Sequence, residues 1–151
     1  MTVSISDTNG IPDLLRRVSE LSQYEVQIGV FQADTDPYPD GTDVISIAFA
    51  HEFGSYRVPE RSFMRAGFDT NKSRIDQLCE TLADRVLHGG LDARAMYEAI
   101  GAEVTGLIQE HLTNLRDPPN SPETIARKGS SNPLIDTGQL RSSITWKVVS
   151  S

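Results

Sequence analysis

Apolar residues recur at helical spacing near the start of the chain. Residues 11–21 carry such a stripe, with Pro12 tolerated in the first turn. A second, shorter apolar segment, residues 44–53, lies between an aspartate and a glycine. Asp43 is a favourable N-cap residue, and Gly54 can end the helix because glycine tolerates the left-handed conformation there. The pattern therefore predicts two helices in the first third of the chain.

Two longer helices are predicted in the middle of the chain. The first is expected to begin at Arg61 and to stop at Gly89 and Gly90. The second begins after the N-cap residue Asp92 and is closed by residues 118–119, two prolines. Their apolar stripes are Phe68, Ile75, Leu78, Leu82 and Val86 in the first helix, and Met96, Ile100, Val104, Ile108, Leu112 and Leu115 in the second.

Alternating apolar residues predict two strands. One is residues 24–31, and the other follows a turn at residues 136–138, Asp-Thr-Gly. The segment 117–133, rich in proline, serine and asparagine, has the composition of an extended loop. The predicted fold class is α+β, with long helices packed on a small antiparallel sheet and an extended loop before the C-terminal strand. The side chains expected on one face of each strand are Tyr24, Val26, Ile28 and Val30 in the first and Ile144, Trp146 and Val148 in the second.

Length and charge narrow the class of protein. The 151 residues suit a single domain, and no apolar run is long enough to suggest a membrane partner. One cysteine, Cys79, excludes an internal disulfide and fits a reducing cytoplasm. The net charge is −7, and residues 1–60 hold ten acidic side chains against three basic ones. Without a basic stripe, specific nucleic-acid binding is not expected. Four aspartates crowd one loop: Asp34, Asp36, Asp40 and Asp43.

The His51-Glu52 pair at the end of an apolar segment raises the question of a zinc enzyme. A zincin needs a second histidine four residues after the first, where this chain has Ser55. The other histidines, His88 and His111, have no suitable carboxylate spacing around them. No phosphate-binding glycine loop or nucleophile elbow is present. The residues therefore predict no catalytic group, metal or cofactor, and a protein that is not an enzyme. A metal-dependent hydrolase using the pair is kept as an alternative.

Two longer segments carry a more specific signal: "AFAHEFGSYRVPERSFMR" (48–65) and "TIARKGSSNPLIDTGQLRSSITWKV" (124–148). Together they resemble the virion-morphogenesis family of tailed phages, which are tail-completion or neck proteins. The match rests on a His-Glu-Phe-Gly, a Pro-x-Arg-x-Phe, a Thr-x-x-x-Lys-Gly and a Leu-Ile-Asp-Thr-Gly-x-Leu-x-x-Ser-Ile, in that order. The residues concerned are His51, Glu52, Phe53, Gly54, Pro59, Arg61 and Phe63, then Thr124, Lys128, Gly129, Leu134, Asp136, Thr137, Gly138, Leu140, Ser143 and Ile144.

The resemblance implies a structural virion protein at the junction of head and tail. It would form part of a ring at the head-proximal end of the tail, assembled in the host cytoplasm and retained in the virion. The implied partners are other copies of itself and neighbouring tail and connector proteins. A tail terminator or collar protein is the alternative role. If the ring surrounds an axial DNA channel, the aspartate loop is expected to face it and repel DNA without binding it.

Residues 51–65, called the corner below, are expected to turn the chain between two helices. Gly54 and Pro59 make the turn, while Phe63 and Met64 anchor the next helix to the sheet. Arg65 lies one helical turn after Arg61. Both arginines are expected to stay free for carboxylates of a partner. The corner is thus predicted to be structural, with two alternatives left open: its residues serve the core alone, or they also form part of an interface. Segment 117–133 is expected to become ordered against a neighbouring subunit.

Overall fold

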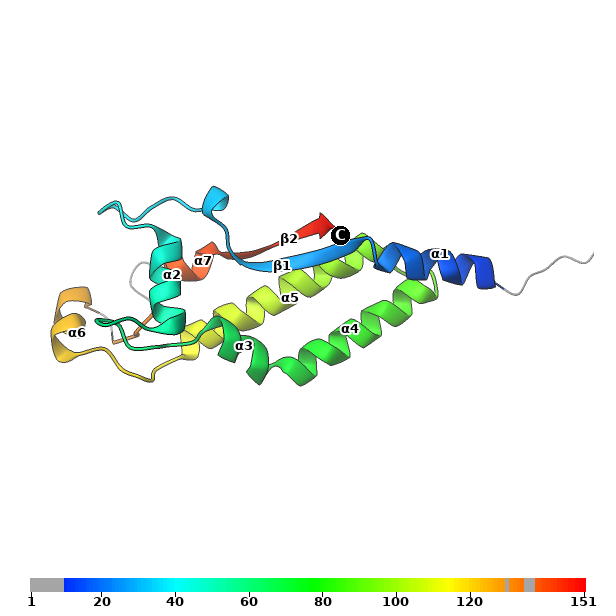
Figure 1. Ribbon diagram of the computed structural model, residues 1–151. Helices are drawn as coiled ribbons and strands as arrows, with labels where there is room; N and C mark the ends of the chain where they lie inside the picture. Colours follow the sequence, from blue (N-terminus) through cyan, green and yellow to red (C-terminus); the bar gives the residue numbers. More distant parts are fainter. Residues whose placement is uncertain (1–9, 130, 135–137) are drawn as a thin grey trace, which may run out of the picture.

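The computed structural model describes residues 10–129, 131–134 and 138–151, and its fold class is α+β, as predicted. Helix α5 is central: the strands run along one side of it and α4 lies along the other (Figure 1). The elements are α1 (Ile11–Leu21), β1 (Tyr24–Val30), the 3-10 helix η1 (Gln32–Asp34), α2 (Val44–Phe53), α3 (Met64–Thr70), α4 (Lys72–Leu87), α5 (Ala93–Asn114), α6 (Pro122–Lys128), α7 (Gln139–Ser143) and β2 (Ile144–Ser150).

The two strands pair antiparallel, from Tyr24 opposite Ser150 to Val30 opposite Ile144. Within the described residues the sheet has these two strands alone, so each strand has one edge without a neighbouring strand there. The sheet approaches α5 closely at Gly101. A Cβ atom at this position would overlap the indole ring of Trp146, so only glycine leaves room for the strand.

The hydrophobic core is built around the inner face of α5. The predicted stripe of this helix is confirmed except at its end, where Leu115 is only partly buried. Phe63 from the corner and Ile144 from β2 are almost fully buried against the same core, and Met64 packs at its margin beside Gly29. Both residues predicted to anchor the next helix therefore pack against the core where α3 begins. Among the described helices, none is both long enough and apolar enough to cross a membrane.

Three predicted helix ends are confirmed, two of them by capping contacts. The Asp43 carboxylate accepts a hydrogen bond from the Ser46 backbone N–H at 3.0 Å, which caps α2. Asp92 caps α5 in the same way by accepting from the backbone N–H of Ala95 at 3.1 Å. Gly54 ends α2 with φ of 75°, a value that favours glycine.

The single helix predicted after Arg61 is two helices. Helix α3 begins at Met64, and Asn71 separates it from α4. The Asn71 side chain donates a hydrogen bond to the carbonyl oxygen of Gly67 at 2.8 Å, competing with the helical backbone pattern. Because of this break, Phe68 in α3 is not in line with the buried stripe of α4. The prediction that Phe68 is buried was wrong, since its side chain is exposed.

The segment 117–133, predicted as an extended loop, contains helix α6. Its signals are local: the Ser121 hydroxyl accepts from the Thr124 backbone N–H at 3.2 Å, and Pro122 occupies the first helical position. Gly129, at φ of 69°, closes the helix. A second helical turn, α7, lies between Gly138 and β2, so the strand does not follow the predicted turn directly.

Candidate interface site at the corner

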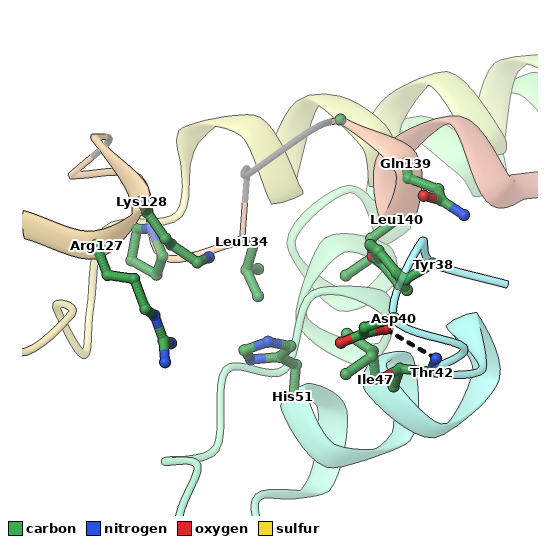
Figure 2. A pocket seen from close by; sticks show the side chains of 12 residues that line it. Tyr38, Asp40, Thr42, Ile47, His51, Arg127, Lys128, Leu134, Gln139 and Leu140 are labelled. Atoms are coloured by element: carbon green, nitrogen blue, oxygen red, sulfur yellow. Dashed lines mark hydrogen bonds between the residues drawn. The ribbon is translucent and has the colours of Figure 1, made fainter. Parts of the chain in front are cut away.

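The two sequence segments that carry the family resemblance meet in space. His51, at the end of α2, lies between two hollows that residues from both segments line. The first hollow, of about 270 Å³, lies between α2, the loop before it and α7 (Figure 2). The second, of about 560 Å³, lies between the corner and α6. Four residues line both hollows: His51, Arg127, Lys128 and Pro133.

Glu52 holds the corner to the start of α3. Its side chain is 5% exposed, and both of its carboxylate oxygens are used. One accepts from the backbone N–H of Met64 at 2.9 Å, and the other from the backbone N–H of Arg65 at 3.0 Å and the Ser62 hydroxyl at 2.8 Å. These N–H groups belong to the first turn of α3, where no helical carbonyl can reach them. A carboxylate from α2 therefore caps α3.

The hydrogen bonds also fix the charge of Glu52. Burial by itself would raise the pKa of this carboxyl group. Hydrogen bonds from the backbone of Met64 and Arg65, and from the side chains of Arg65 and Ser62, outweigh burial and lower the pKa below its ordinary value. Glu52 is therefore a charged structural acceptor rather than a carboxylate free to take up a proton.

Arg65 is not free, contrary to the sequence prediction. Its guanidinium donates to the Glu52 carboxylate at 2.9 Å, to the Glu52 backbone carbonyl at 2.8 Å and to Glu60 at 2.8 Å. It also lies over the ring of Phe53, 4.8 Å from the centroid. The partners come from the same corner, so Arg65 closes the turn on itself.

The prediction was also wrong for Arg61, whose side chain is 5% exposed. Its guanidinium donates to the carbonyl oxygens of Pro118 at 2.7 Å and Pro119 at 3.1 Å, and to the Asn120 side-chain oxygen at 3.3 Å. Burial lowers the pKa of Arg61. Arg61 thus ties the corner to the segment that leads into α6, an attachment that links positions almost sixty residues apart.

His51 has an unusual environment for a histidine. Its Nδ1 atom is buried and has no hydrogen-bond partner within the described residues. Burial, together with the positive charges of Arg61 and Lys128, lowers the pKa of His51 to about 4. The ring is therefore neutral near pH 7. Its backbone carbonyl, by contrast, accepts from the Arg61 N–H at 2.7 Å and so helps to fix the corner.

The lowered pKa of His51 predicts a pH-dependent stability. An unfolded histidine takes up a proton near pH 6.5, whereas the folded ring resists it down to about pH 4. Between these values the unfolded chain binds more protons, so stability falls as the pH falls, by at most about 3 kcal/mol. We expect His51→Gln to remove this part of the loss in urea titrations between pH 7 and 4. His88→Gln, a control at an exposed histidine, should keep this loss. If the free energy of unfolding changes equally with pH in both variants, the loss does not come from His51.

The cations left available around the second hollow are Arg57 of the corner and Arg127 and Lys128 of α6. All three line the second hollow together with Arg61, and none of the described residues forming that hollow is a carboxylate. None of the three makes an ion pair within the described part of the chain. In a chain of net charge −7, this is a local positive surface. The sequence prediction named Lys128 but missed Arg57 and Arg127, although Arg127 adjoins Lys128.

The rest of the C-terminal motif is structural. Leu134, Leu140 and Ile144 are buried in the core. The Ser143 hydroxyl donates to the Gln139 carbonyl oxygen at 2.7 Å, within the short helix α7. Two further motif residues, Thr124 and Gly129, serve the start and the end of α6, and Gly138 starts α7 with φ of 78°. The predicted roles of Asp136 and Thr137 lie outside the described residues.

The four aspartates of the acidic loop differ in what they contact. Asp43 caps α2, and Asp34 forms an ion pair with Lys147 of β2 at 2.7 Å. Hydrogen bonds from Thr42 hold the pKa of Asp40 below its ordinary value. Asp36 and Asp40 are exposed to solvent. These two carboxylates are the ones available for the channel-facing role that the sequence suggested.

Within residues 10–129, 131–134 and 138–151, no group of three or more histidine, cysteine, aspartate or glutamate side chains could hold a metal ion. Comparison of the chain with protein-family models, with curated proteins and with solved structures gives no match. The site is therefore interpreted from its own geometry, in which buried polar contacts fix a turn and exposed cations surround a hollow.

Proposed function

We propose that the chain is a structural protein of a tailed-phage virion, acting in tail completion at the neck, where the head joins the tail. The observation that carries the proposal is that the two family-like segments meet around His51. His51 from the first segment lines one hollow with Lys128 and Leu134 from the second, and Arg61 lines the other with Lys128. Because these residues build one structural unit, a structural role explains why the family-like pattern is present, and no catalytic role is needed.

In this role the chain forms a ring with other copies at the head-proximal end of the tail. It is assembled in the host cytoplasm and stays in the virion. The cations Arg57, Arg127 and Lys128 offer a surface for acidic groups of neighbouring tail or connector proteins. The exposed carboxylates of Asp36 and Asp40 face the channel, where they keep DNA from adhering. A tail terminator or collar protein is the alternative role within the same assembly.

The geometry favours a structural role over a metal-dependent hydrolase. Such a hydrolase would need Glu52 as a free base beside His51. Both oxygens of the Glu52 carboxylate are already engaged by Ser62, Met64 and Arg65. The Glu52 carboxylate is thus held in the framework of the corner and is not free to act as a base.

Binding to isolated tails tests the proposal. Light scattering of the purified chain, alone and with tails that lack it, should show a fixed number of copies added per tail, and electron microscopy should place them at the head-proximal end. Arg127→Glu combined with Lys128→Glu should weaken this binding at least tenfold, because it reverses two charges of the hollow. Arg94→Glu, on the exposed side of α5, is the matched control. Failure of the wild-type chain to bind tails would refute the proposal.

A further inference from the structure

Helix α1 presents apolar side chains to solvent. Leu14, Leu15 and Val18 are 43%, 63% and 49% exposed, and no described residue of α1 is buried. With Ile11, they occupy positions i, i+3, i+4 and i+7, which form one face of a helix. We call this face the α1 stripe. A contiguous apolar face of this kind ordinarily packs against another surface.

A second apolar surface lies elsewhere on the same molecule. A hollow of about 530 Å³ between β1, α3 and α5 continues into one of about 210 Å³ between β1 and α2, and Ile28 and Met64 line both. We call the two together the β1 groove. Exposed aromatic rings stand along it, with Phe49 and Phe53 in contact at 4.7 Å between centroids. The apolar side chains of the groove come from β1, α2, α3, α5 and the corner, among them Val26, Ile28, Val30, Met64 and Phe68.

The two surfaces match in length. From Ile11 to Val18 the α1 stripe rises by about 10 Å, at the usual rise of a helix. The strand that forms one wall of the groove extends about 13 Å from Val26 to Val30. Insertion of an amphipathic helix into an apolar groove, through anchors spaced i, i+3, i+4 and i+7, is a common mode of protein recognition.

The charges of the two surfaces permit their contact. In α1, the two arginines Arg16 and Arg17 balance Asp13 and Glu20. In the first hollow of the groove, Arg65 and Asp69 carry opposite charges. The net charge of −7 comes from residues 1–60, so two copies repel where acidic surfaces of this part of the chain meet. The α1 stripe and the β1 groove do not repel each other in this way, because neither surface is strongly acidic.

The stripe of a chain cannot reach the groove of the same chain. Arg17 donates to the carbonyl oxygen of Leu87 at 2.8 Å, and the Tyr97 hydroxyl donates to that of Leu21 at 2.8 Å. These bonds hold α1 at the C-terminal end of α4, whereas α3 lies at the other end (Figure 1). Helix α4, with 16 residues, separates the two by about 24 Å.

We infer that α1 of one copy inserts its stripe into the β1 groove of the next copy. The contact joins two different surfaces, so repetition gives a head-to-tail chain of copies that closes into a ring when the rotation allows. The inference supplies the self-contact of the ring and rests on the proposed function for its place in a virion. The occupant of the groove is thus a second copy of this chain.

Two single substitutions test the contact. Leu15→Asp destroys the stripe and leaves the groove intact, and Phe68→Glu does the reverse; both positions are exposed, so the fold should tolerate the changes. Sedimentation equilibrium should show concentration-dependent oligomers for the wild-type chain. Each variant alone should be monomeric, and a mixture of the two should form heterodimers through the intact stripe of one and the intact groove of the other. Tyr56→Asp, fully exposed on the corner and outside both surfaces, should associate like the wild type.

Two outcomes would overturn the inference. One is a wild-type chain that remains monomeric at about 1 mM, where even a contact of about 4 kcal/mol is half formed. Another is association of either variant alone, which would indicate a symmetric contact or a different occupant. Heterodimers in the mixture, combined with no binding to tails, would leave the inference standing and refute the proposed function instead.

Discussion

Glu52→Ala is expected to lower the free energy of unfolding by about 2–4 kcal/mol, because it leaves two backbone N–H groups of α3 without an acceptor. The acceptor lost is the buried carboxylate that bonds the N–H groups of Met64 and Arg65. Arg65 itself is half exposed and can turn to water, so its charge adds little to the loss. Urea denaturation at pH 7 measures the effect.

Two further variants separate the cap from the ion pair. Glu52→Gln keeps one acceptor oxygen and should lose less stability than Glu52→Ala. Glu60→Ala removes only the exposed partner of Arg65 and should change the free energy of unfolding by less than about 1 kcal/mol. Because the folded state lowers the pKa of Glu52, its contribution is complete above the ordinary value of 4.5 and is lost as the pH falls below it. Equal effects of Glu52→Ala and Glu60→Ala would contradict the capping role.

Arg61→Ala is expected to cost about 2–3 kcal/mol of stability and to loosen the segment around residues 118–133 selectively. Three acceptors lose a charged donor: the carbonyl oxygens of Pro118 and Pro119 and the side-chain oxygen of Asn120. The loss is partly offset because the buried guanidinium no longer has to be desolvated. Hydrogen exchange of the amides in α6 should accelerate more than that of the amides in α5.

Arg61→Met is the informative companion variant, because methionine fills much of the same space without donating hydrogen bonds. If hydrogen bonding holds the segment, both variants should loosen it; if packing does, only Arg61→Ala should. Arg127→Ala, which removes an exposed cation of α6, should leave the exchange rates unchanged. Uniform acceleration across α5 and α6 in Arg61→Ala would mean that Arg61 supports the whole fold rather than this attachment.

Local signals accounted for much of the fold. The caps at Asp43 and Asp92 and the glycine at position 54 were readable from the sequence because each acts on neighbouring backbone groups. The alternation in residues 24–31 identified β1 for a similar reason, since one face of the strand packs on α5. The cap at Ser121 was equally local but was outweighed by the loop-like composition around it.

The arginines of the corner could not be placed from local pattern. Arginine is seldom buried, so Arg61 was expected at the surface; its burial depends on carbonyl oxygens 57 and 58 residues further along the chain. The meeting of His51 with Lys128 is likewise a product of tertiary structure. The predicted burial of Phe68 was wrong for a different reason. Its helix is interrupted at Asn71, and the interruption shifts the phase of the apolar stripe.

The pairing of β1 with β2 has a consequence for the order of folding. Tyr24 pairs with Ser150, so the sheet cannot begin to form until nearly all of the sequence shown has left the ribosome. The helices depend on nearer neighbours and can form earlier. Until β2 arrives, the edge of β1 that pairs with it and the surface of α5 that receives Trp146 stay uncovered, and the nascent chain is most prone to aggregate in this interval.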